Sequence, residues 1–313
     1  MEKTVDKKLI SIVVPCYNEE STVRTFYDRA VEVFDKTNYN YEMIFVNDGS
    51  RDKTREILAE LASDKRVKVI NFSRNFGQQS AILCGFKAAK GDAVVEADCD
   101  LQDPLEVVYD MLAKWEEGYE VIHGRRKKRK GETFFKRATA NLYYKFVSKI
   151  TKVPIPRNTG DFKLYDRKAL NAIIEMPERD KYLRGLASWV GFKQTFVDFD
   201  RNERVAGETK YTLKKMIGLA KSGIVSNSDY PLYLSLKSGI IFSLLSVLTF
   251  IVFIVLAICK VSLPLCAWLF PTLVLMFSLA YLFNGLTNVY LARVYDEVKK
   301  RPDYIVSDTL NLD

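Results

Sequence analysis

The residues with the most evident chemical potential lie in one short acidic stretch, EADCDLQDP, at positions 96–104. Asp98, Asp100 and Gln102 alternate with other residues directly after the apolar run at 93–95. In an extended chain, alternate residues face the same side, so these three side chains are expected to converge. Two carboxylates and an amide oxygen are hard ligands suited to Mg²⁺ or Mn²⁺. The stretch predicts a divalent metal site, although a solvated acidic loop carries the same pattern.

Asp103, in the same stretch, has a different interpretation. It precedes Pro104, and Glu106 follows three residues after Asp103. This order is typical of a helix N-cap, a proline at the first helical position and a capping-box glutamate. We therefore predict that Asp103 begins the next helix rather than binding a metal, and that Asp103→Asn mainly spares activity.

The elements that must position these residues alternate between strands and helices. Apolar strand signals cover 9–15, 41–48, 67–72, 93–98 and 120–124. Helical signals cover 20–36, 53–63, 78–89 and 104–118. The rhythm predicts an α/β fold with a mostly parallel sheet and helices on both faces. Ligands of such sheets bind beyond the carboxyl ends of strands, which is where Asp48 and Asp98 fall.

After Gly124 this rhythm changes. The expected elements are a basic loop, a helix at about 132–149, a Pro-rich turn at 153–160, helices at 167–176 and 180–190, and a strand at 193–199. Residues 212–226 alternate basic and apolar side chains at helical spacing. This segment predicts either a helix on the membrane surface or an amphipathic helix packed on the head.

Two long uncharged runs follow, at 238–259 and 261–292, with Lys260 between them. A bilayer core of about 30 Å needs roughly 20 helical residues. We predict two transmembrane helices, Ser238–Cys259 and Leu265–Tyr290, joined by a short loop. The alternative is a buried hairpin in a soluble core.

Basic residues flank both predicted spans, which places both flanks in the cytoplasm. The expected organisation has four parts: a cytoplasmic head domain at 1–210, juxtamembrane amphipathic helices at 211–236, two transmembrane helices at 237–292 and a cytoplasmic tail at 293–313. The expected location is therefore a membrane, with the head and the tail on its cytoplasmic side.

Composition excludes several other chemistries. The five cysteines show no paired metal spacing, and a cytosolic location argues against disulfides. The single histidine, His123, makes a histidine-rich metal site or a Ser/His nucleophile scheme improbable, and it is interpreted as an ordinary strand-end residue. The net charge of +8 beside a membrane favours anionic lipid or phosphate partners over nucleic acid.

Several motifs in order resemble family 2 glycosyltransferases of the GT-A fold. They are VVPCYNEE (13–20), VNDGSRDKT (46–54), SRNFGQQSA (73–81) and the acidic stretch. The later motifs NTGDFKLYDRKAL and RVAGETKYTLKKM, with the two uncharged runs, narrow the likeness. The whole chain resembles bacterial polyprenyl-phosphate glycosyltransferases of the undecaprenyl-phosphate glucosyltransferase type, and it is similar to the dolichyl-phosphate mannose synthase group.

The resemblance implies roles for individual residues. Those that match nucleotide-sugar contacts are Pro15, Tyr17, Glu19, Asp48 and Asp98. Those that match the metal and diphosphate site are Asp98, Asp100 and Gln102. Those that match the reaction centre or the acceptor phosphate are Asp100, Asp161, Arg125, Arg204 and Lys210. Asp161 is expected to orient groups, with a general-base role as the alternative. Gln78 and Gln79 depart from many relatives, which leaves the sugar contacts open.

The resulting hypothesis is inverting transfer of a hexose, glucose first, from a UDP-sugar to undecaprenyl phosphate, assisted by Mg²⁺ or Mn²⁺. The product is a β-linked lipid for envelope glycan modification. A homo-oligomer such as a tetramer and a flippase partner are further implications of the resemblance. The alternatives are UDP-N-acetylglucosamine or GDP-mannose as the donor, or a membrane-anchored scaffold that binds sugar nucleotides without turnover. A processive polysaccharide synthase is disfavoured because the QxxRW pattern is absent.

Overall fold

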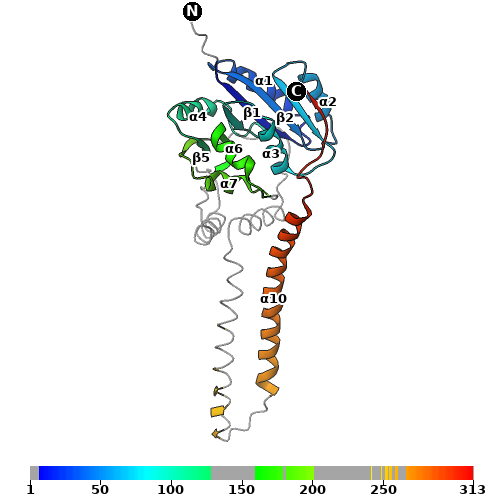
Figure 1. Ribbon diagram of the computed structural model, residues 1–313, viewed down its shortest axis with the longest axis vertical. Coiled ribbons are helices and arrows are strands. Elements are labelled where there is room, and N and C mark those ends of the chain that lie inside the picture. The colour runs from blue at the N-terminus through cyan, green and yellow to red at the C-terminus, as the bar shows by residue number, and fades with distance from the viewer. Residues whose placement is uncertain are drawn as a thin grey trace, which may run out of the picture. The chain divides into compact units, whose positions relative to one another are not determined.

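The computed structural model describes residues 7–127, 159–178, 181–200 and 266–312, with isolated positions between 241 and 259. The chain divides into two compact units, one built on a sheet and one that contains a long helix (Figure 1). In chain order the described elements are β1 (Leu9–Cys16), α1 (Val23–Phe34), β2 (Asn40–Asn47), α2 (Thr54–Leu61), β3 (Val67–Phe72), α3 (Gln78–Ala88), β4 (Ala93–Glu96), α4 (Val107–Glu116), β5 (Val121–Arg126), β6 (Thr159–Asp166), α6 (Arg167–Glu175), α7 (Leu183–Trp189), β7 (Gln194–Phe199), α10 (Cys266–Lys299) and β8 (Val306–Leu310).

The sheet is mostly parallel, as predicted. Its described strands lie in the order β7-β5-β6-β4-β1-β2-β3-β8. β6 is antiparallel to both of its neighbours, β4 and β5, and β8 is antiparallel to β3. Neither antiparallel strand was expected from the sequence. β6 occupies the segment next to the predicted Pro-rich turn, and β8 lies within the predicted cytoplasmic tail.

The two faces of the sheet are covered by different helices (Figure 1). Along β1, Ile12 and Val14 pack in the core with α1, α2 and α4, whereas Val13 packs in the opposite core with α3, α6 and α7. All three side chains are fully buried. Alternate residues of a strand face opposite sides, so a strand covered on both faces needs an unbroken apolar run. The run LISIVVP is therefore the sequence signature of a central strand.

Most predicted elements agree with the structure to within a few residues. Two differences occur around the acidic stretch. The strand expected at 93–98 ends at Glu96, and the helix expected from Pro104 begins at Val107. Six predicted features lie wholly or largely outside the described residues: the helix at 132–149, most of the Pro-rich turn, the segment 211–236, most of the first membrane span, Arg204 and Lys210.

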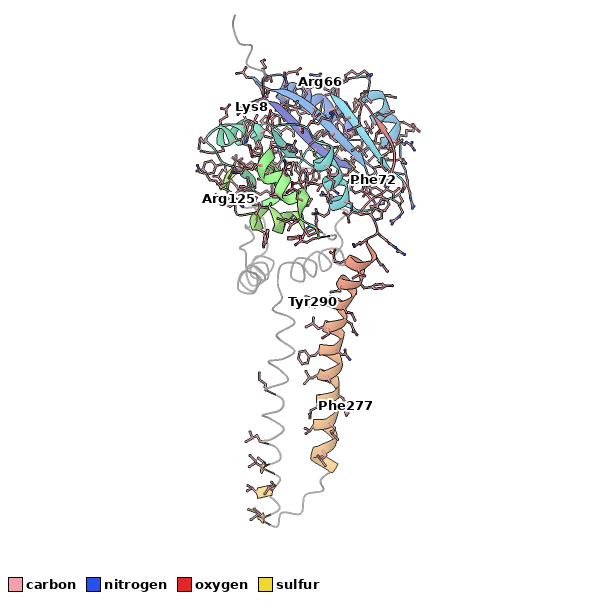
Figure 2. The ribbon with its side chains drawn as sticks, in the orientation of Figure 1. Lys8, Arg66, Phe72, Arg125, Phe277 and Tyr290 are labelled. Carbon is pink, nitrogen blue, oxygen red and sulfur yellow. The ribbon has the colours of Figure 1, made fainter. Side chains whose placement is uncertain are left out.

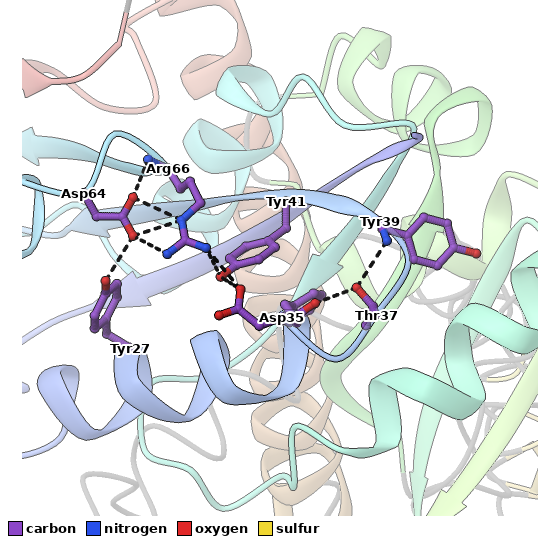
Figure 3. A network of polar contacts seen from close by, with 8 residues as sticks. Tyr27, Asp35, Thr37, Tyr39, Tyr41, Asp64 and Arg66 are labelled. Atoms are coloured by element: carbon purple, nitrogen blue, oxygen red, sulfur yellow. Dashed lines mark hydrogen bonds and ion pairs between the residues drawn. The ribbon is translucent and has the colours of Figure 1, made fainter. Parts of the chain in front are cut away.

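A polar network fastens the amino ends of β2 and β3 to the end of α1 (Figure 3). The Arg66 guanidinium donates to Asp64, with Nη2 and Oδ2 2.8 Å apart, and to Asp35 Oδ1 over 3.1 Å. The hydroxyls of Tyr27 and Tyr41 donate to Asp64 and Asp35. Because parallel sheets bind ligands at the opposite ends of their strands, this network serves the fold rather than the chemistry.

α10 is the long helix of the second unit and extends over 34 residues. Within the residues that the structure describes in full, no helix is both long and apolar enough to cross a membrane. The predicted hairpin of two transmembrane helices is therefore not confirmed. Most of Ser238–Cys259 lies outside that set of residues.

His123 is a buried residue of β5, in agreement with its interpretation as a strand residue. Its Nε2 lies 2.9 Å from Gln194 Oε1, and its ring stacks on Phe196. Burial, followed by the nearby positive charge of Lys163, lowers the pKa of His123 to about 4. The imidazole therefore stays neutral in the folded protein well below the pH at which the unfolded chain takes up a proton.

This difference predicts a specific pH dependence of stability. The unfolded histidine binds a proton near pH 6.5, so the free energy of unfolding falls as the pH drops from about 6.5 towards 4. His123→Gln should reduce this slope by up to about 1.4 kcal/mol per pH unit. Urea unfolding of the full chain at several pH values in that window measures the slope. The protein has one histidine, so no other imidazole contributes. If the free energy of unfolding changed with pH equally in the variant and the wild type, the lowered pKa of His123 would be contradicted.

Candidate active site

The loop after β4 carries the predicted metal ligands, but it is not extended. β4 ends at Glu96, and Leu101 adopts a left-handed backbone with φ 54°. The backbone N–H of Gln102 donates to Asp100 Oδ1 over 3.1 Å, which closes a local turn. The prediction that strand alternation aligns the three side chains is therefore wrong, because the chain turns between them. The loop still brings Asp98 and Asp100 close enough for their charges to interact.

Negative charge accumulates at this end of the sheet. The pKa of Asp98 is raised to about 7, mainly by burial and then by the nearby carboxylates of Asp161, Asp100 and Asp103. Burial likewise raises the pKa of Glu96, on the strand below, to about 8. Like charges that are partly desolvated disfavour the ionised form, and a cation placed among them reverses that preference. This group of carboxylates is suited to a divalent cation.

The buried amide oxygen of Gln102 is a second feature that fits a bound cation. Its Oε1 is buried and has no hydrogen-bond partner among the described residues. A buried amide oxygen without a partner is costly, and a metal ion or a ligand donor would satisfy it. Within the described ranges, however, no three acidic, cysteine or histidine side chains are grouped so as to hold a metal by themselves. The residues present fit a cation that takes part of its coordination from elsewhere, as Mg²⁺ commonly does with water and phosphates.

Asp161 lies on β6 and is held by Arg184 at the start of α7. The Arg184 Nε and Nη2 atoms donate to the two carboxylate oxygens over 2.6 and 2.7 Å. Burial opposes ionisation, but these hydrogen bonds and charges lower the pKa of Asp161 below its usual value. A carboxylate that is fully ionised and bonded on both oxygens is a weak proton acceptor. The geometry therefore favours an orienting role for Asp161 over a general-base role.

Two glutamines, Gln78 and Gln79, also contact residues of this acidic site. The sequence indicated them only as a departure from related motifs. Gln78 Nε2 donates to Asp98 Oδ1 over 2.9 Å. Gln79 Oε1 accepts from the backbone N–H of Leu183, next to Arg184, over 3.2 Å. The first turn of α3 thus connects the acidic loop to the helix that holds Asp161. Their position after Gly77, whose φ is 104°, places both amides at a helix start.

The predicted nucleotide contacts lie at the carboxyl ends of β1 and β2. Pro15 is in β1, and Tyr17 and Glu19 follow it in the loop before α1. The backbone N–H of Glu19 donates to Thr54 Oγ1 over 2.8 Å, which joins this loop to the start of α2. The loop between β1 and α1 is therefore hydrogen-bonded to the segment between β2 and α2, beside the acidic group.

Asp48, after β2, has a structural task that the sequence did not reveal. Its carboxylate accepts from Asn75 Nδ2 and from the backbone N–H groups of Phe76 and Gly77 over 2.6 to 3.0 Å. It is 3% exposed, and burial raises its pKa although these hydrogen bonds act in the opposite direction. Asp48 therefore shapes the loop between β3 and α3. A contact with a nucleotide remains a prediction.

Adjacent arginines at the end of β5 point to different partners. Arg125, labelled in Figure 2, donates through Nη2 to Asp198 Oδ2 over 2.9 Å and lies over the Phe196 ring. Arg126 instead donates to Asp103 over 3.0 Å, and its charge favours ionised Asp161. The predicted role of Asp103 as a helix N-cap is wrong. α4 begins after Glu106, and the Asp103 carboxylate is turned towards β5 by the Arg126 guanidinium.

Comparison with known proteins agrees with this geometry. Residues 11–174 match the family described as glycosyl transferase family 2. The chain is 47% identical to the uncharacterized glycosyltransferase YkcC of Bacillus subtilis, over 97% of this chain and 94% of the relative. It is 36% identical to the bactoprenol glucosyl transferase of Shigella phage SfII, over 95% and 97% of the two chains. The chain belongs to glycosyl transferase family 2.

A solved structure is also similar to this chain. It is glucosyl-3-phosphoglycerate synthase from Mycobacterium tuberculosis in complex with Mn²⁺, UDP and glucosyl-3-phosphoglycerate. The TM-score is 0.47 at 18% identity, over 70% of this chain and 78% of that chain. At that distance its ligands carry no argument for the ligands of this chain.

The Asp161–Arg184 pair generates a prediction for glycosyl transfer. Arg184→Gln removes both hydrogen bonds, so Asp161 should lose its orientation and its pKa should rise. We expect kcat to fall about 10²-fold, because small misplacements of positioning groups have effects of that size. The acid limb of the kcat profile should also move to higher pH, because a carboxylate with a higher pKa is protonated earlier as the pH falls.

Measurement of kcat against pH tests both expectations. Arg29→Gln is the matched control, because Arg29 lies on α1 and its side chain is 44% exposed. A reduced kcat with an unmoved acid limb would mean that Arg184 acts on folding alone.

Proposed function

We propose that this protein transfers glucose from UDP-glucose to undecaprenyl phosphate at the cytoplasmic face of a bacterial membrane. The observation that carries the proposal is the acidic group around Asp98 and Asp161, which adjoins the loops after β1 and β2. When the sugar is transferred, the nucleoside diphosphate departs from the anomeric carbon, and it is a good leaving group only when the charge on its phosphates is neutralised. An acidic group that recruits a divalent cation meets that need. The acceptor and the sugar are inferred from the bactoprenol glucosyl transferases that the chain resembles.

The donor would lie across the carboxyl ends of β1, β2 and β4. Asp98, Asp100 and Gln102 would hold Mg²⁺ or Mn²⁺, which acts as a Lewis acid on the diphosphate when bound. Gln78 keeps the Asp98 carboxylate in place for that task, since its amide donates to one oxygen. The nucleoside is proposed to contact the segments that contain Pro15, Tyr17, Glu19 and Asp48.

The acceptor requires little help from a base. A phosphate monoester has a second pKa of about 6, so it is mostly dianionic at neutral pH. Asp161, kept ionised by Arg184, is proposed to orient the reacting groups. Arg125, Arg204 and Lys210 are proposed to bind the acceptor phosphate, since guanidinium and ammonium groups form strong charge-assisted hydrogen bonds with phosphate oxygens. A single displacement at the anomeric carbon would convert an α-linked donor into a β-linked product.

The location of the reaction follows from the lipid acceptor. The uncharged runs at 238–259 and 261–292 are proposed to cross the membrane as two helices, with the basic flanks on the cytoplasmic side. Residues 211–236 are proposed to lie at the membrane surface. Assembly as a homo-oligomer, such as a tetramer, and a flippase that accepts the product remain parts of the same proposal.

The donor identity has the most direct test. Purified full-length protein should form a glycolipid when it receives undecaprenyl phosphate, Mg²⁺ or Mn²⁺ and UDP-glucose. UDP-N-acetylglucosamine and GDP-mannose are the competing donors. Mass spectrometry of the lipid product identifies the sugar, because a hexose and an N-acetylhexosamine differ in mass. A product formed only with GDP-mannose would replace UDP-glucose by the second candidate, and no product with any donor would contradict the proposal.

A second prediction separates an enzyme from a scaffold that only binds sugar nucleotides. Asp100→Asn keeps the shape of the side chain but removes a charge from the proposed metal site. We expect turnover to fall by about 10²-fold or more, since electrostatic groups at reaction centres have effects of that order. Asp110→Asn is the control, because it makes the same change at an exposed position on α4. Equal activity of the two variants in the glycolipid assay would contradict the proposed site.

A further inference from the structure

The C-terminal strand β8 forms the edge of the sheet beside β3. Asn71 pairs in register with Asp308, and Val69 pairs with Leu310. The pairing extends to the carboxyl end of β3, where the backbone N–H of Ser73 donates to the carbonyl of Ile305 over 3.0 Å. β8 therefore reaches the same end of the sheet as the proposed donor site. The sequence of the tail did not reveal this pairing.

Aromatic packing and a capping amide hold the strand in place. Tyr304 stacks on Phe72, with ring centroids 5.0 Å apart and an angle of 8° between the planes. At the other end, Asn311 Nδ2 donates to the carbonyls of Ala62 and Val67. Three independent kinds of contact, the ladder, the stacking and the amide, make β8 an integral strand of this unit.

A line of hydrogen bonds runs from β8 across β3 and β2. Asn71 Nδ2 donates to Asp308 Oδ1 over 2.9 Å, and Asn47 Nδ2 donates to Asn71 Oδ1 over 2.9 Å. Asn47 Oδ1 then accepts from the backbone N–H of Ser50 over 3.0 Å. Both asparagines are buried, with 2–3% of their surfaces exposed. Each amide therefore depends on its neighbours in the line for its hydrogen bonds.

The line continues into the first loop of the proposed donor site. Ser50 Oγ accepts from the backbone N–H of Asn18 over 3.0 Å, and Asn18 Oδ1 accepts from the backbone N–H of Arg51 over 2.9 Å. Asn18 lies between Tyr17 and Glu19 and has a left-handed backbone with φ 54°. The hydrogen bonds thus connect the C-terminal strand to both loops that are proposed to contact the nucleoside.

Asp308 determines how the side-chain amides along this line of hydrogen bonds are oriented. An ionised carboxylate only accepts hydrogen bonds, so Asn71 must turn its NH₂ group towards Asp308 and its oxygen towards Asn47. Asn47 must then offer its NH₂ group to Asn71 and its oxygen to Ser50. Arg55 Nη2 also donates to both oxygens of Asp308 over 2.9 Å, so the carboxylate accepts hydrogen bonds from both sides. An asparagine at 308 could both donate and accept, so both buried amides could then reverse.

We propose that Asp308 is a positioning residue for the donor site, acting through Asn71 and Asn47 on the loops at 17–19 and 48–51. The inference rests on the proposed function, since it takes these loops to bind the nucleoside part of the donor. It assigns the C-terminal strand a part in donor binding although β8 itself lies at the far edge of the sheet.

Hydrogen exchange of the full-length protein tests the line without any ligand. Asp308→Asn should accelerate amide exchange in segments that contain Asn18 and Ser50, whose N–H groups are donors in the line. Thr309→Ala is the matched control, because Thr309 is an exposed residue of the same strand. Unchanged exchange at 17–19 and 48–51 in Asp308→Asn would overturn the proposal, as would equal acceleration in Thr309→Ala.

Binding of UDP and GDP to the same proteins tests the consequence. By calorimetry, Asp308→Asn should raise the Kd of the bound nucleotide about fivefold, which corresponds to the loss of about one hydrogen bond. Arg55→Gln should change it less, because Asp308 keeps its contact with Asn71. A Kd equal to wild type despite faster loop exchange would also overturn the positioning role. If wild-type protein binds neither nucleotide, the proposed donor site fails, and with it the positioning role, whereas the exchange result still decides whether the line exists.

Discussion

The crowding of carboxylates at the carboxyl end of β4 and the amino end of β6 is the constraint on which the rest of the site depends. Asp98, Asp100 and Asp161 repel one another in a partly desolvated place, and Glu96 adds a fully buried carboxyl beneath them. The protein offsets only part of this charge, through Arg184 on Asp161 and through Lys163 near Glu96. The Asp98 carboxylate accepts its hydrogen bond from the neutral amide of Gln78 rather than from a cationic side chain. The negative charge that these groups leave uncompensated favours binding of a divalent ion or a cationic ligand at this site.

The inverted strand β6 creates this situation. Because β6 lies between β4 and β5 and runs against both, Asp161 near its amino end comes to the same edge as the carboxyl end of β4. A parallel strand at that position would have carried Asp161 to the opposite edge. The helices α3 and α7 then contribute Gln78 and Arg184 from the face that they cover. One reversal of strand direction thus explains why residues 63 positions apart, Asp98 and Asp161, share one electrostatic environment.

Local pattern was sufficient for much of this architecture. Apolar runs such as LISIVVP identified the central parallel strands, and the strand-end positions of Asp48 and Asp98 followed from them. The pattern did not identify β6, since Lys163 interrupts its apolar residues and is nevertheless buried. It also missed β8, whose exposed edge has no strong apolar signal. Side-chain pairing over long separations, as in Arg126 with Asp103 or Arg184 with Asp161, leaves no periodic trace in a single sequence.

The central claim is that this acidic group binds a divalent cation together with the nucleotide. Electron paramagnetic resonance of Mn²⁺ added to the full-length protein, with and without UDP, tests it most directly. The account predicts that wild-type protein binds a single Mn²⁺ more tightly when UDP is present, and that Asp98→Asn and Asp100→Asn lose this ion while remaining folded. Absence of bound Mn²⁺ in the wild type with UDP, or binding of Mn²⁺ by either variant as tight as in the wild type, would contradict it.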